Sequence, residues 1–297
     1  MIKPEKNTIQ HTLTHINEVL ATMYPDEERR ELARILIEEV TGLSRSMLLA
    51  CPLQPLSDNE HKTIEQALSR LANHEPIQYV LGKAWFRGNE FAVNNSVLIP
   101  RPETEELVSL VLSTLKENPQ LPKTVLDAGT GSGCIAISIK LEETRTEVSA
   151  FDYSPDAVQI AEKNAKALGA DVKFFINDIF NFTEKYNYEK LGVLVSNPPY
   201  IRESEKTHMR NNVLDFEPVS ALFVPDKNAL CYYEALKQMG EHILIDKGFL
   251  IVEINEALGD NLIQLFSQSK FSVPIIHNDM RGKPRFLSTQ YCKNKNI

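Results

Sequence analysis

The sequence predicts an α/β fold in which helices cover both faces of a mostly parallel sheet, preceded by a small all-helical domain. Three observations support this prediction. From about residue 103 onward, strand patterns alternate with helix patterns, as in parallel sheets. Before residue 75, apolar residues recur at helical spacing. Near the C-terminus, two strand patterns follow each other without a helix between them, which predicts an antiparallel edge.

Residues 1–75 are expected to form the helical domain. Asp26 is the expected cap of its second helix, which Gly42 ends, and Ser57 or Asp58 is expected to cap a later helix. The apolar positions of these helices include Ile9, Leu13, Ile16, Leu20, Leu32, Ile35, Leu36, Ile64, Leu68 and Leu71. No residue pattern in this part indicates chemistry, so we expect a packing or partner-docking module.

Residues 76–100 are expected to link the domains as a β-hairpin. Pro76 ends the helical pattern, and strand-forming residues then follow, interrupted by Gly82 and Gly88. Trp85 and Phe86 are expected to lie in the core.

Residues 101–297 are expected to form the α/β domain with a seven-stranded sheet. The helix patterns cover residues 107–115, 133 onward, 156–168 and 258–265. The strand patterns cover 124–128, a segment ending at 152, then 172–176, 192–195, 248–254, 271–276 and 285–291. The last two strands form the predicted antiparallel edge.

Composition narrows the classes of function. The formal net charge is −8, which disfavours a broad nucleic-acid surface, although a local basic groove remains compatible with it. The four cysteines are far apart without a C-x-x-C pair, and the seven histidines lack metal-ligand spacing. We therefore expect no metal site, and a cytoplasmic protein with reduced thiols. No signal peptide or membrane span is expected, because residues 1–6 precede no apolar stretch and Asp246 and Lys247 interrupt residues 243–254.

A glycine-rich loop follows the strand at residues 124–128. Gly129, Gly131 and Gly133 form a G-x-G-x-G pattern between this apolar strand and a helix, and glycines let a ligand approach the backbone closely. The dinucleotide fingerprint would need a glycine at Cys134, and no G-K-[ST] follows. The obvious ligand is therefore neither a pyrophosphate nor a triphosphate.

Two acids follow the loop at the ends of the next strands. Asp152 lies nineteen residues after Gly133, where an acid in doubly wound folds accepts hydrogen bonds from ribose hydroxyls. Asn177 and Asp178 end the following strand and are placed to meet an adenine, with Ile179 and Phe180 covering its face. The alternative is that these acids only cap helices or turns.

The loop and the acids together resemble the class I S-adenosylmethionine-dependent methyltransferases, which have a Rossmann-like fold. The resemblance implies that Gly129, Thr130, Gly131 and Gly133 line the cofactor, with S-adenosylhomocysteine as the product. It also implies that Asp127 positions the amino-acid end of the cofactor, that Asp152 binds its ribose, and that Asp178 and Asn197 complete the cofactor site.

The tetrapeptide Asn197–Tyr200, with the sequence N-P-P-Y, directly follows the apolar strand at 192–195. Open α/β sheets bind ligands at this end of their strands. An amide nitrogen is a poor nucleophile with two N–H donors, and we expect the Asn197 side chain and the Pro198 carbonyl to accept them. Proline stiffens the backbone there without a competing N–H, and Tyr200 is expected to stack on the flat group. Asn197, Pro198 and Tyr200 are the predicted catalytic residues, and all four are predicted to bind substrate; a simple strand-terminating turn is the alternative.

The N-P-P-Y motif does not decide the substrate. The same type of motif serves the methylation of glutamine amides, of exocyclic amino groups of adenine or cytosine in DNA, and of guanine in RNA. A third alternative is a non-catalytic protein that binds the cofactor or a translation factor. Such a protein would be expected to carry a damaged motif, whereas the glycine loop and N-P-P-Y are intact.

Nearly the whole chain resembles one family, the protein-glutamine N5-methyltransferases that modify class I peptide chain release factors (the PrmC/HemK family). The resemblance rests on the stretches at residues 75–82, 97–105, 197–201, 216–218 and 282–286, and P-R-P-E-T-E at 100–105 is particularly specific. It implies that the target is the glutamine of a Gly-Gly-Gln motif and that the helical domain engages the release factor. We expect a monomer without stable nucleic-acid or membrane partners.

One position departs from the family pattern. The family commonly has Glu-Ile-Gly where this chain has Glu253, Ile254 and Asn255. Asparagine tolerates the left-handed conformation that glycine would supply, so the turn is expected to persist. The roles of Arg101, Glu103 and Glu217 stay open between ordering the linker or a lid and forming an ion pair or a helix cap.

Overall fold

The computed structural model describes residues 7–181 and 191–295. The chain forms two compact units: Met1–Gly82 with Arg210–Phe216, and Lys83–Met209 with Glu217–Ile297. Each unit has a hydrophobic core of its own. The domain boundaries expected at residues 75 and 100 stay predictions.

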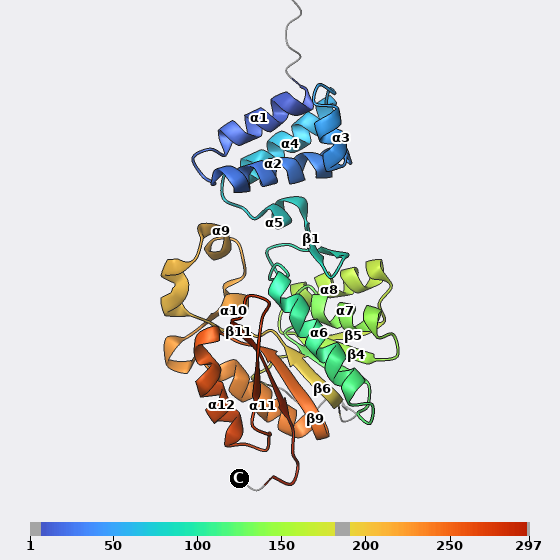
Figure 1. Ribbon diagram of the computed structural model, residues 1–297, viewed down its shortest axis with the longest axis vertical. Helices are drawn as coiled ribbons and strands as arrows, with labels where there is room; N and C mark the ends of the chain where they lie inside the picture. Colours follow the sequence, from blue (N-terminus) through green and yellow to red (C-terminus); the bar gives the residue numbers. More distant parts are fainter. Residues whose placement is uncertain (1–6, 182–190, 296–297) are drawn as a thin grey trace, which may run out of the picture. The chain divides into compact units, whose positions relative to one another are not determined.

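The first unit is helical, as Figure 1 shows. It contains α1 (Ile9–Val19), α2 (Asp26–Thr41), α3 (Arg45–Ala50), α4 (Asp58–Leu71), α5 (Ile77–Leu81) and α9 (Asn211–Leu214). Ser57 caps α4 in a capping box with Glu60, and Gly42 ends α2 in the left-handed conformation, as predicted. The prediction for Asp26 was wrong: it is the first residue of α2, and Pro25 occupies the cap position without a side-chain hydrogen bond.

Residues 77–81 form the one-turn helix α5 and not a strand. Pro76 stands at its N-cap and Gly82 ends it with a φ of 73°. The strand-forming side chains of this segment misled the prediction, because Pro76 and Gly82, with five residues between them, bound a single helical turn.

The predicted hairpin is present but shorter than expected. Strand β1 (Lys83–Phe86) pairs antiparallel with β2 (Asn89–Ala92). Phe86 and Phe91 are buried in edge-to-face contact, whereas Trp85 is 67% exposed, so its predicted core position was wrong. The cause is strand alternation, which turns Ala84 and Phe86 inward and Trp85 outward. Val97 and Ile99 are buried and Leu98 is half-buried, and residues 97–99 form no strand.

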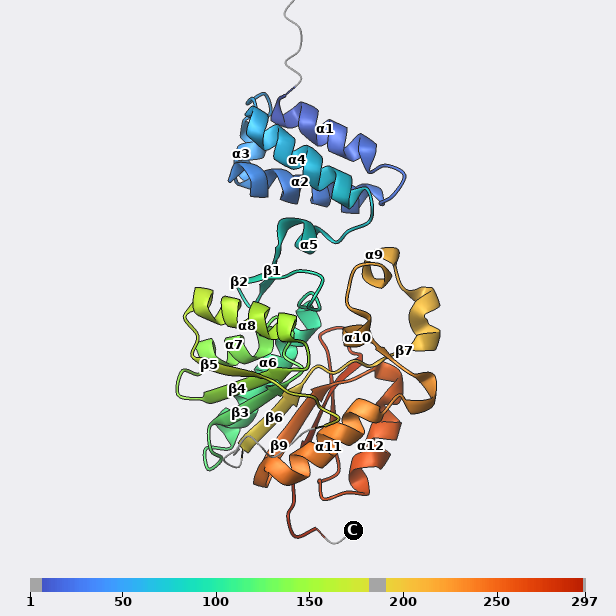
Figure 2. The same cartoon turned by 180° about the vertical axis from the view of Figure 1, so that it is seen from behind.

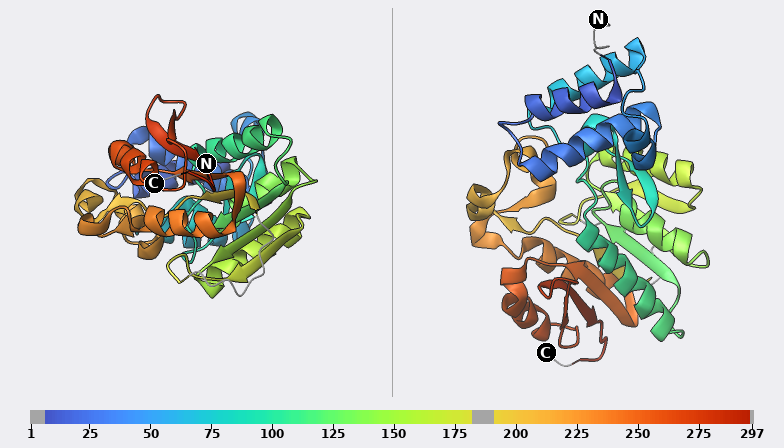
Figure 3. Two further views of the ribbon diagram at one scale, coloured as in Figure 1. Left: turned by 90° about the horizontal axis from the view of Figure 1, so that it is seen from below. Right: turned by 45° about the horizontal axis from the view of Figure 1, so that its top comes forward.

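The second unit is built on a seven-stranded sheet, which confirms the predicted architecture. Its strands are β3 (Thr124–Ala128), β4 (Glu147–Asp152), β5 (Val172–Ile176), β6 (Leu191–Ser196), β9 (Leu244–Glu253), β10 (Ile275–Asn278) and β11 (Pro284–Gln290). The order across the sheet is β10-β11-β9-β6-β3-β4-β5. Pairs within β5, β4, β3, β6 and β9 are parallel, and β11 and β10 form the antiparallel edge, dark red in Figure 3.

Helices cover both faces of this sheet (Figure 2). Alternate residues of the central strands point to opposite faces. Val125 and Val193 pack in the cluster of α6 (Pro102–Glu117), α7 (Cys134–Glu142) and α8 (Pro155–Leu168). Leu126 and Leu194 pack in the cluster of α11 (Cys231–Ile243) and α12 (Gly259–Ser267).

Several elements of the second unit were not predicted. Helix α11 buries Tyr233, Leu236, Met239 and Ile243, whose helical spacing was a usable signal. The others are short: β7 (Ile201–Arg202), η1 (Glu203–His208), α10 (Val219–Leu222), β8 (Phe223–Val224), η2 (Asp226–Asn228) and η3 (Glu256–Leu258). Among residues 7–181 and 191–295, no helix combines the length and the apolar character needed to cross a bilayer.

Candidate active site

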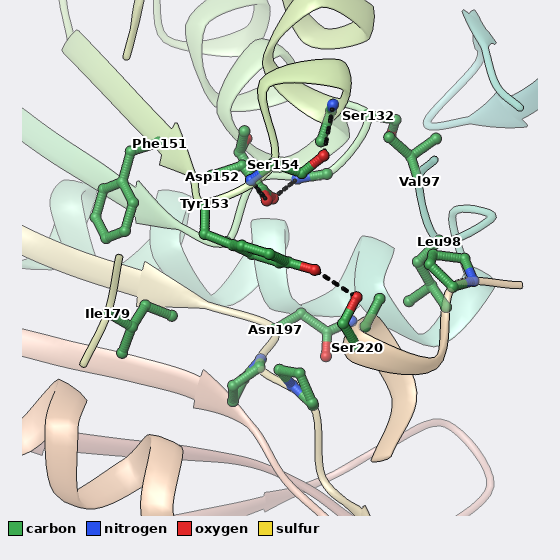
Figure 4. Close-up of a pocket in the computed structure, with 18 of the residues that line it drawn as sticks. Val97, Leu98, Ser132, Phe151, Asp152, Tyr153, Ser154, Ile179, Asn197 and Ser220 are labelled. Carbon is green, nitrogen blue, oxygen red and sulfur yellow. Dashed lines mark hydrogen bonds between the residues drawn. The ribbon is translucent and has the colours of Figure 1, made fainter. Parts of the chain in front are cut away.

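A pocket of about 560 Å³ lies at the carboxyl ends of β3, β4, β5 and β6. A volume of this size suits a small-molecule site. Of the predicted site residues, Gly129, Thr130, Gly131, Asp152, Asp178, Asn197, Pro198 and Pro199 line the pocket. The lining does not include Asp127, Gly133 or Tyr200. Figure 4 shows part of the pocket lining.

The glycine loop has a backbone conformation that glycine adopts readily, and hydrogen bonds to β4 hold it in place. Gly129, Gly131 and Gly133 have φ values of 77°, 55° and 82°, which favour glycine. The N–H groups of Gly129 and Thr130 donate to the Phe151 carbonyl at 2.9 and 3.0 Å. The loop therefore depends on glycine for its path and on β4 for its anchoring.

Gly133 is also crowded, which yields a stability prediction. A Cβ atom there would lie 2.9 Å from Ile137 Cδ1 and 3.1 Å from Ala161 Cβ. Gly169 has a similar φ of 70° with nothing within 4 Å, so it is a matched control. We expect Gly133→Ala to lower the free energy of unfolding by roughly 1–3 kcal/mol more than Gly169→Ala. Urea unfolding measures the difference, and equal losses would contradict the crowding argument.

Two acids flank the glycine loop. Asp127 is fully buried, and its burial raises its pKa to about 7. Its Oδ2 accepts from the Thr130 hydroxyl at 2.6 Å, while its Oδ1 has no hydrogen-bond partner in the described chain. Asp152 accepts from the Gly131 N–H at 2.9 Å and from the Ser154 N–H at 3.0 Å, one on each oxygen. Each Asp152 oxygen keeps a lone pair for a further donor.

Asp178 has a more local environment than Asp152. Its carboxylate accepts from the Phe180 N–H at 2.9 Å and from the Asn181 side chain at 2.8 Å, which are bonds within its own turn. The neighbouring Asn177 Nδ2 is buried without a hydrogen-bond partner in the described residues. Phe180 and Tyr232, on the same wall, are in contact with their ring centroids 4.7 Å apart and their planes tilted by 53°. The geometry thus joins a polar donor to an aromatic surface.

Two segments form the opposite wall of the pocket. Glu217 is buried, pairs with Arg101 and accepts from the Ile99 N–H at 3.2 Å. This pair joins the segment before α6 to the start of α10 within the second unit, so the ion pair of Arg101 is not between domains. Glu217 is not the helix cap, because Pro218 occupies the N-cap of α10, and a role in ordering the linker or a lid stays a prediction for both residues. Tyr153 and Ser220 complete the wall, with their hydroxyls 2.7 Å apart (Figure 4). Glu103 lies 3.8 Å from Arg281.

Asn197 comes directly after β6, whose end is anchored by a bond of 2.6 Å from the Ser196 hydroxyl to the Ala128 carbonyl. Its side-chain Nδ2 donates to Thr104 at 3.2 Å. Among the hydrogen bonds of the described residues, the Asn197 side chain takes part in this one, through its NH₂ end and not through Oδ1. The site therefore presents an acceptor oxygen beside the glycine loop.

Tyr200 is fixed at both ends. Its hydroxyl donates to Glu253 at 2.8 Å, and its carbonyl accepts from Asn255 Nδ2 at 3.1 Å. Asn255 has a φ of −69°, so the left-handed conformation considered for this position was wrong. Its side chain also donates to Glu205 at 3.0 Å and accepts from the Ala257 N–H at 2.9 Å. The departure from glycine thus adds contacts to the N-P-P-Y segment.

The sequence missed the parts played by Thr104 and Glu253. Both are buried, and Thr104 Oγ1 donates to Glu253 Oε2 at 2.8 Å. A signal for Glu253 existed: an acid within the apolar run of residues 249–254 is expected to be buried and partnered.

Family models and similar proteins match most of this chain, and they agree with one another on its family. Residues 11–82 match the PrmC N-terminal domain, and residues 105–215 match the methyltransferase small domain. The chain is 39% identical to the release factor glutamine methyltransferase of Bacteroides thetaiotaomicron, over 92% of this chain and 97% of the relative. It is 36% identical to that of Bacillus subtilis, over 93% and 96%. The solved hMettl16 catalytic domain, in complex with MAT2A 3′UTR hairpin 6, has a TM-score of 0.51 at 12% identity, covering 84% of this chain and 87% of that chain, which shows a shared fold alone.

Proposed function

The chain belongs to the family of release factor glutamine methyltransferases, and we propose that it methylates the side-chain amide nitrogen of a glutamine in class I peptide chain release factors. The glutamine is that of the Gly-Gly-Gln motif, the methyl donor is S-adenosylmethionine, and the modification tunes translation termination in the cytoplasm. The N-terminal helical unit engages the release factor, and the enzyme works as a monomer.

The observation that carries this proposal is the acceptor oxygen of Asn197. Its Nδ2 is already bonded to Thr104, so Oδ1 is the polar atom available to an incoming amide N–H. Asn197, Pro198 and Pro199 all line the pocket that also contains the glycine loop. A planar nitrogen with two N–H groups matches this set of acceptors.

The pocket residues fit S-adenosylmethionine. Each Asp152 oxygen accepts one backbone N–H and has capacity for one ribose hydroxyl. Ser132 and Asn177 are among the residues that line the pocket, and Asn177 Nδ2 is a buried donor without a hydrogen-bond partner in the described residues. An ammonium at the amino-acid end of the cofactor would favour the charged form of the buried Asp127, whose pKa burial raises to about 7. Gly129, Thr130 and Gly131 let the ligand approach the backbone, Gly133 holds the loop closely against α7 and α8, and Asp178 keeps the turn beside the adenine in shape.

When bound, the cofactor supplies an activated methyl group on a sulfonium. The chain contributes positioning: Asn197 Oδ1 and the Pro198 carbonyl hold the amide so that its nitrogen faces that methyl group. Positioning of this kind contributes up to roughly 7–11 kcal/mol in favourable cases. As the nitrogen gains positive character, its N–H groups become stronger donors, so these acceptors stabilise the transition state more than the ground state. Tyr200 lies outside the pocket lining and holds the N-P-P-Y segment in place through its bond to Glu253.

Methylation of a nucleic-acid amino group is the competing proposal. The net charge of −8 argues against a wide phosphate-binding surface. The likeness to a structure with bound RNA concerns the fold alone, because the identity is 12%.

A labelled-cofactor assay tests the proposal directly. Purified class I release factor, its Gly-Gly-Ala variant, DNA and RNA are offered side by side to the wild-type enzyme and to Asn197→Ala. We expect label on the intact release factor only, and only with the wild-type enzyme. Label on nucleic acid, or equal label on the Gly-Gly-Ala variant, would contradict the proposed substrate.

A further inference from the structure

A chain of hydrogen bonds runs from Asn197 into the protein interior. Asn197 Nδ2 donates to Thr104 Oγ1 at 3.2 Å, and Thr104 Oγ1 donates to Glu253 Oε2 at 2.8 Å. The other carboxylate oxygen, Oε1, accepts from the Tyr200 hydroxyl at 2.8 Å. Thr104 of α6 and Tyr200 of the N-P-P-Y segment thus meet at one buried carboxylate at the end of β9, and Asn197 is joined to it through Thr104.

The geometry points to Glu253 as a positioning residue for methyl transfer: acting through Thr104, it fixes the Asn197 amide with its oxygen toward the acceptor nitrogen. This inference rests on the proposed function. It concerns an acid that does not itself line the pocket but is bonded to Thr104, which does.

The direction of each hydrogen bond decides which end of the Asn197 amide faces the pocket. A carboxylate only accepts, so the single hydrogen of the Thr104 hydroxyl is committed to Glu253. The Thr104 oxygen can then only accept from Asn197, which must offer its NH₂ group. The two ends of an asparagine amide have nearly the same shape, so packing alone does not fix which end faces the pocket. Glu253 removes this ambiguity.

The surroundings of Glu253 suit a carboxylate that is costly to bury and is kept for orientation. It is 1% exposed, and its burial raises its pKa, as does the nearby Glu103. The pKa of Glu253 is lowered by the hydrogen bonds from the Thr104 and Tyr200 hydroxyls and by the positive charge of Arg285. A buried acid of this kind contributes little to stability compared with apolar packing.

The backbone of Glu253 is fixed as well. Its carbonyl accepts from the buried Tyr233 hydroxyl at 3.1 Å, and β9 pairs with β6 up to Ser196 and Val252. The residues that follow these two, Asn197 and Glu253, therefore stand on neighbouring strand ends. Because both strand ends are fixed, the position of the Glu253 carboxylate sets the orientation of the Asn197 amide through Thr104.

The test compares Thr104→Val, Thr104→Ser and Glu253→Gln. Valine keeps the shape of threonine but removes the hydroxyl, whereas serine keeps the hydroxyl. In Glu253→Gln, we expect the oxygen of the new amide to accept from Tyr200 and its NH₂ group to donate to Thr104. The Thr104 hydroxyl then donates to Asn197 and no longer accepts from it. The Asn197 amide must therefore turn over, so that its NH₂ group faces the pocket. We expect Thr104→Val and Glu253→Gln to lower kcat roughly 10²-fold, as for the loss of one oriented catalytic group. KM for the cofactor should stay within about twofold, and Thr104→Ser should keep kcat within about threefold of wild type.

Each result is measured on release factor with the wild-type enzyme in parallel, together with the thermal unfolding midpoint and cofactor affinity. Wild-type enzyme that fails to label the release factor overturns the proposed function itself. Labelling by wild type together with unchanged kcat in Thr104→Val and Glu253→Gln overturns only the positioning role. A loss confined to cofactor affinity also overturns it. If Glu253→Gln does not fold, the Thr104 pair decides the question alone.

Discussion

Replacing Asn197 with alanine is expected to reduce turnover on release factor by roughly 10³-fold while cofactor affinity changes by less than about threefold. The side chain supplies the acceptor oxygen, and its Nδ2 is bonded to Thr104. Alanine removes the acceptor and leaves the Thr104 oxygen without its donor. Single-turnover kinetics and calorimetric titration of the cofactor measure the two effects separately.

Asn261 offers a matched control for this change, because it is an exposed asparagine of α12 in the second unit, outside the pocket lining. Asn261→Ala should leave the chemical rate within about twofold, as is usual for substitutions away from the reacting groups. If Asn197→Ala kept wild-type turnover, Asn197 would not be a catalytic residue, and the N-P-P-Y segment would be only a turn.

Replacing Asp152 with alanine is expected to raise the dissociation constant of the cofactor roughly 10²-fold, because hydrogen bonds to a charged group contribute about 1.5–3 kcal/mol each. The substitution removes the carboxylate proposed to bind the ribose. It also removes the acceptor for the Gly131 and Ser154 N–H groups, so the glycine loop loses an anchor. Calorimetric titration measures the change.

Two further variants separate these contributions. Asp152→Asn keeps one acceptor oxygen and should lose less affinity than Asp152→Ala. Asp171→Ala, an exposed acid outside the pocket lining, should bind like wild type. Wild-type affinity in Asp152→Ala would refute the ribose-binding assignment, and equal losses in both Asp152 variants would show that the full charge is needed.

The fold and the pocket wall could be predicted because their signals are local. The class I methyltransferase fold is confirmed, since strand alternation, the glycine loop and the strand-end acids each lie within a short stretch. Asp152 bonding to Gly131 shows how two predicted features meet in space. Parallel strands bring their carboxyl ends to one edge, so residues at these ends converge without further information.

The support behind the pocket could not be predicted in the same way. Thr104 and Glu253 are 149 positions apart, and their contact depends on how α6 packs against the end of β9. Asn255 contacts Tyr200 across 55 positions. The predicted core position of Trp85 was wrong for another reason. The sequence indicated a strand there, but which of its faces points to the core depends on the register of a short hairpin. Such features follow from tertiary packing and not from sequence spacing.

The fixed direction of the Asn197 amide also bears on discrimination between glutamine and glutamate. An outward-facing oxygen attracts an N–H group and repels a carboxylate oxygen, while the NH₂ end of the Asn197 amide is directed toward Thr104. A release factor whose target glutamine has been hydrolysed to glutamate would therefore be rejected by repulsion as well as by its lack of a nitrogen. Such damaged proteins should consequently compete poorly for the enzyme, even when they are abundant.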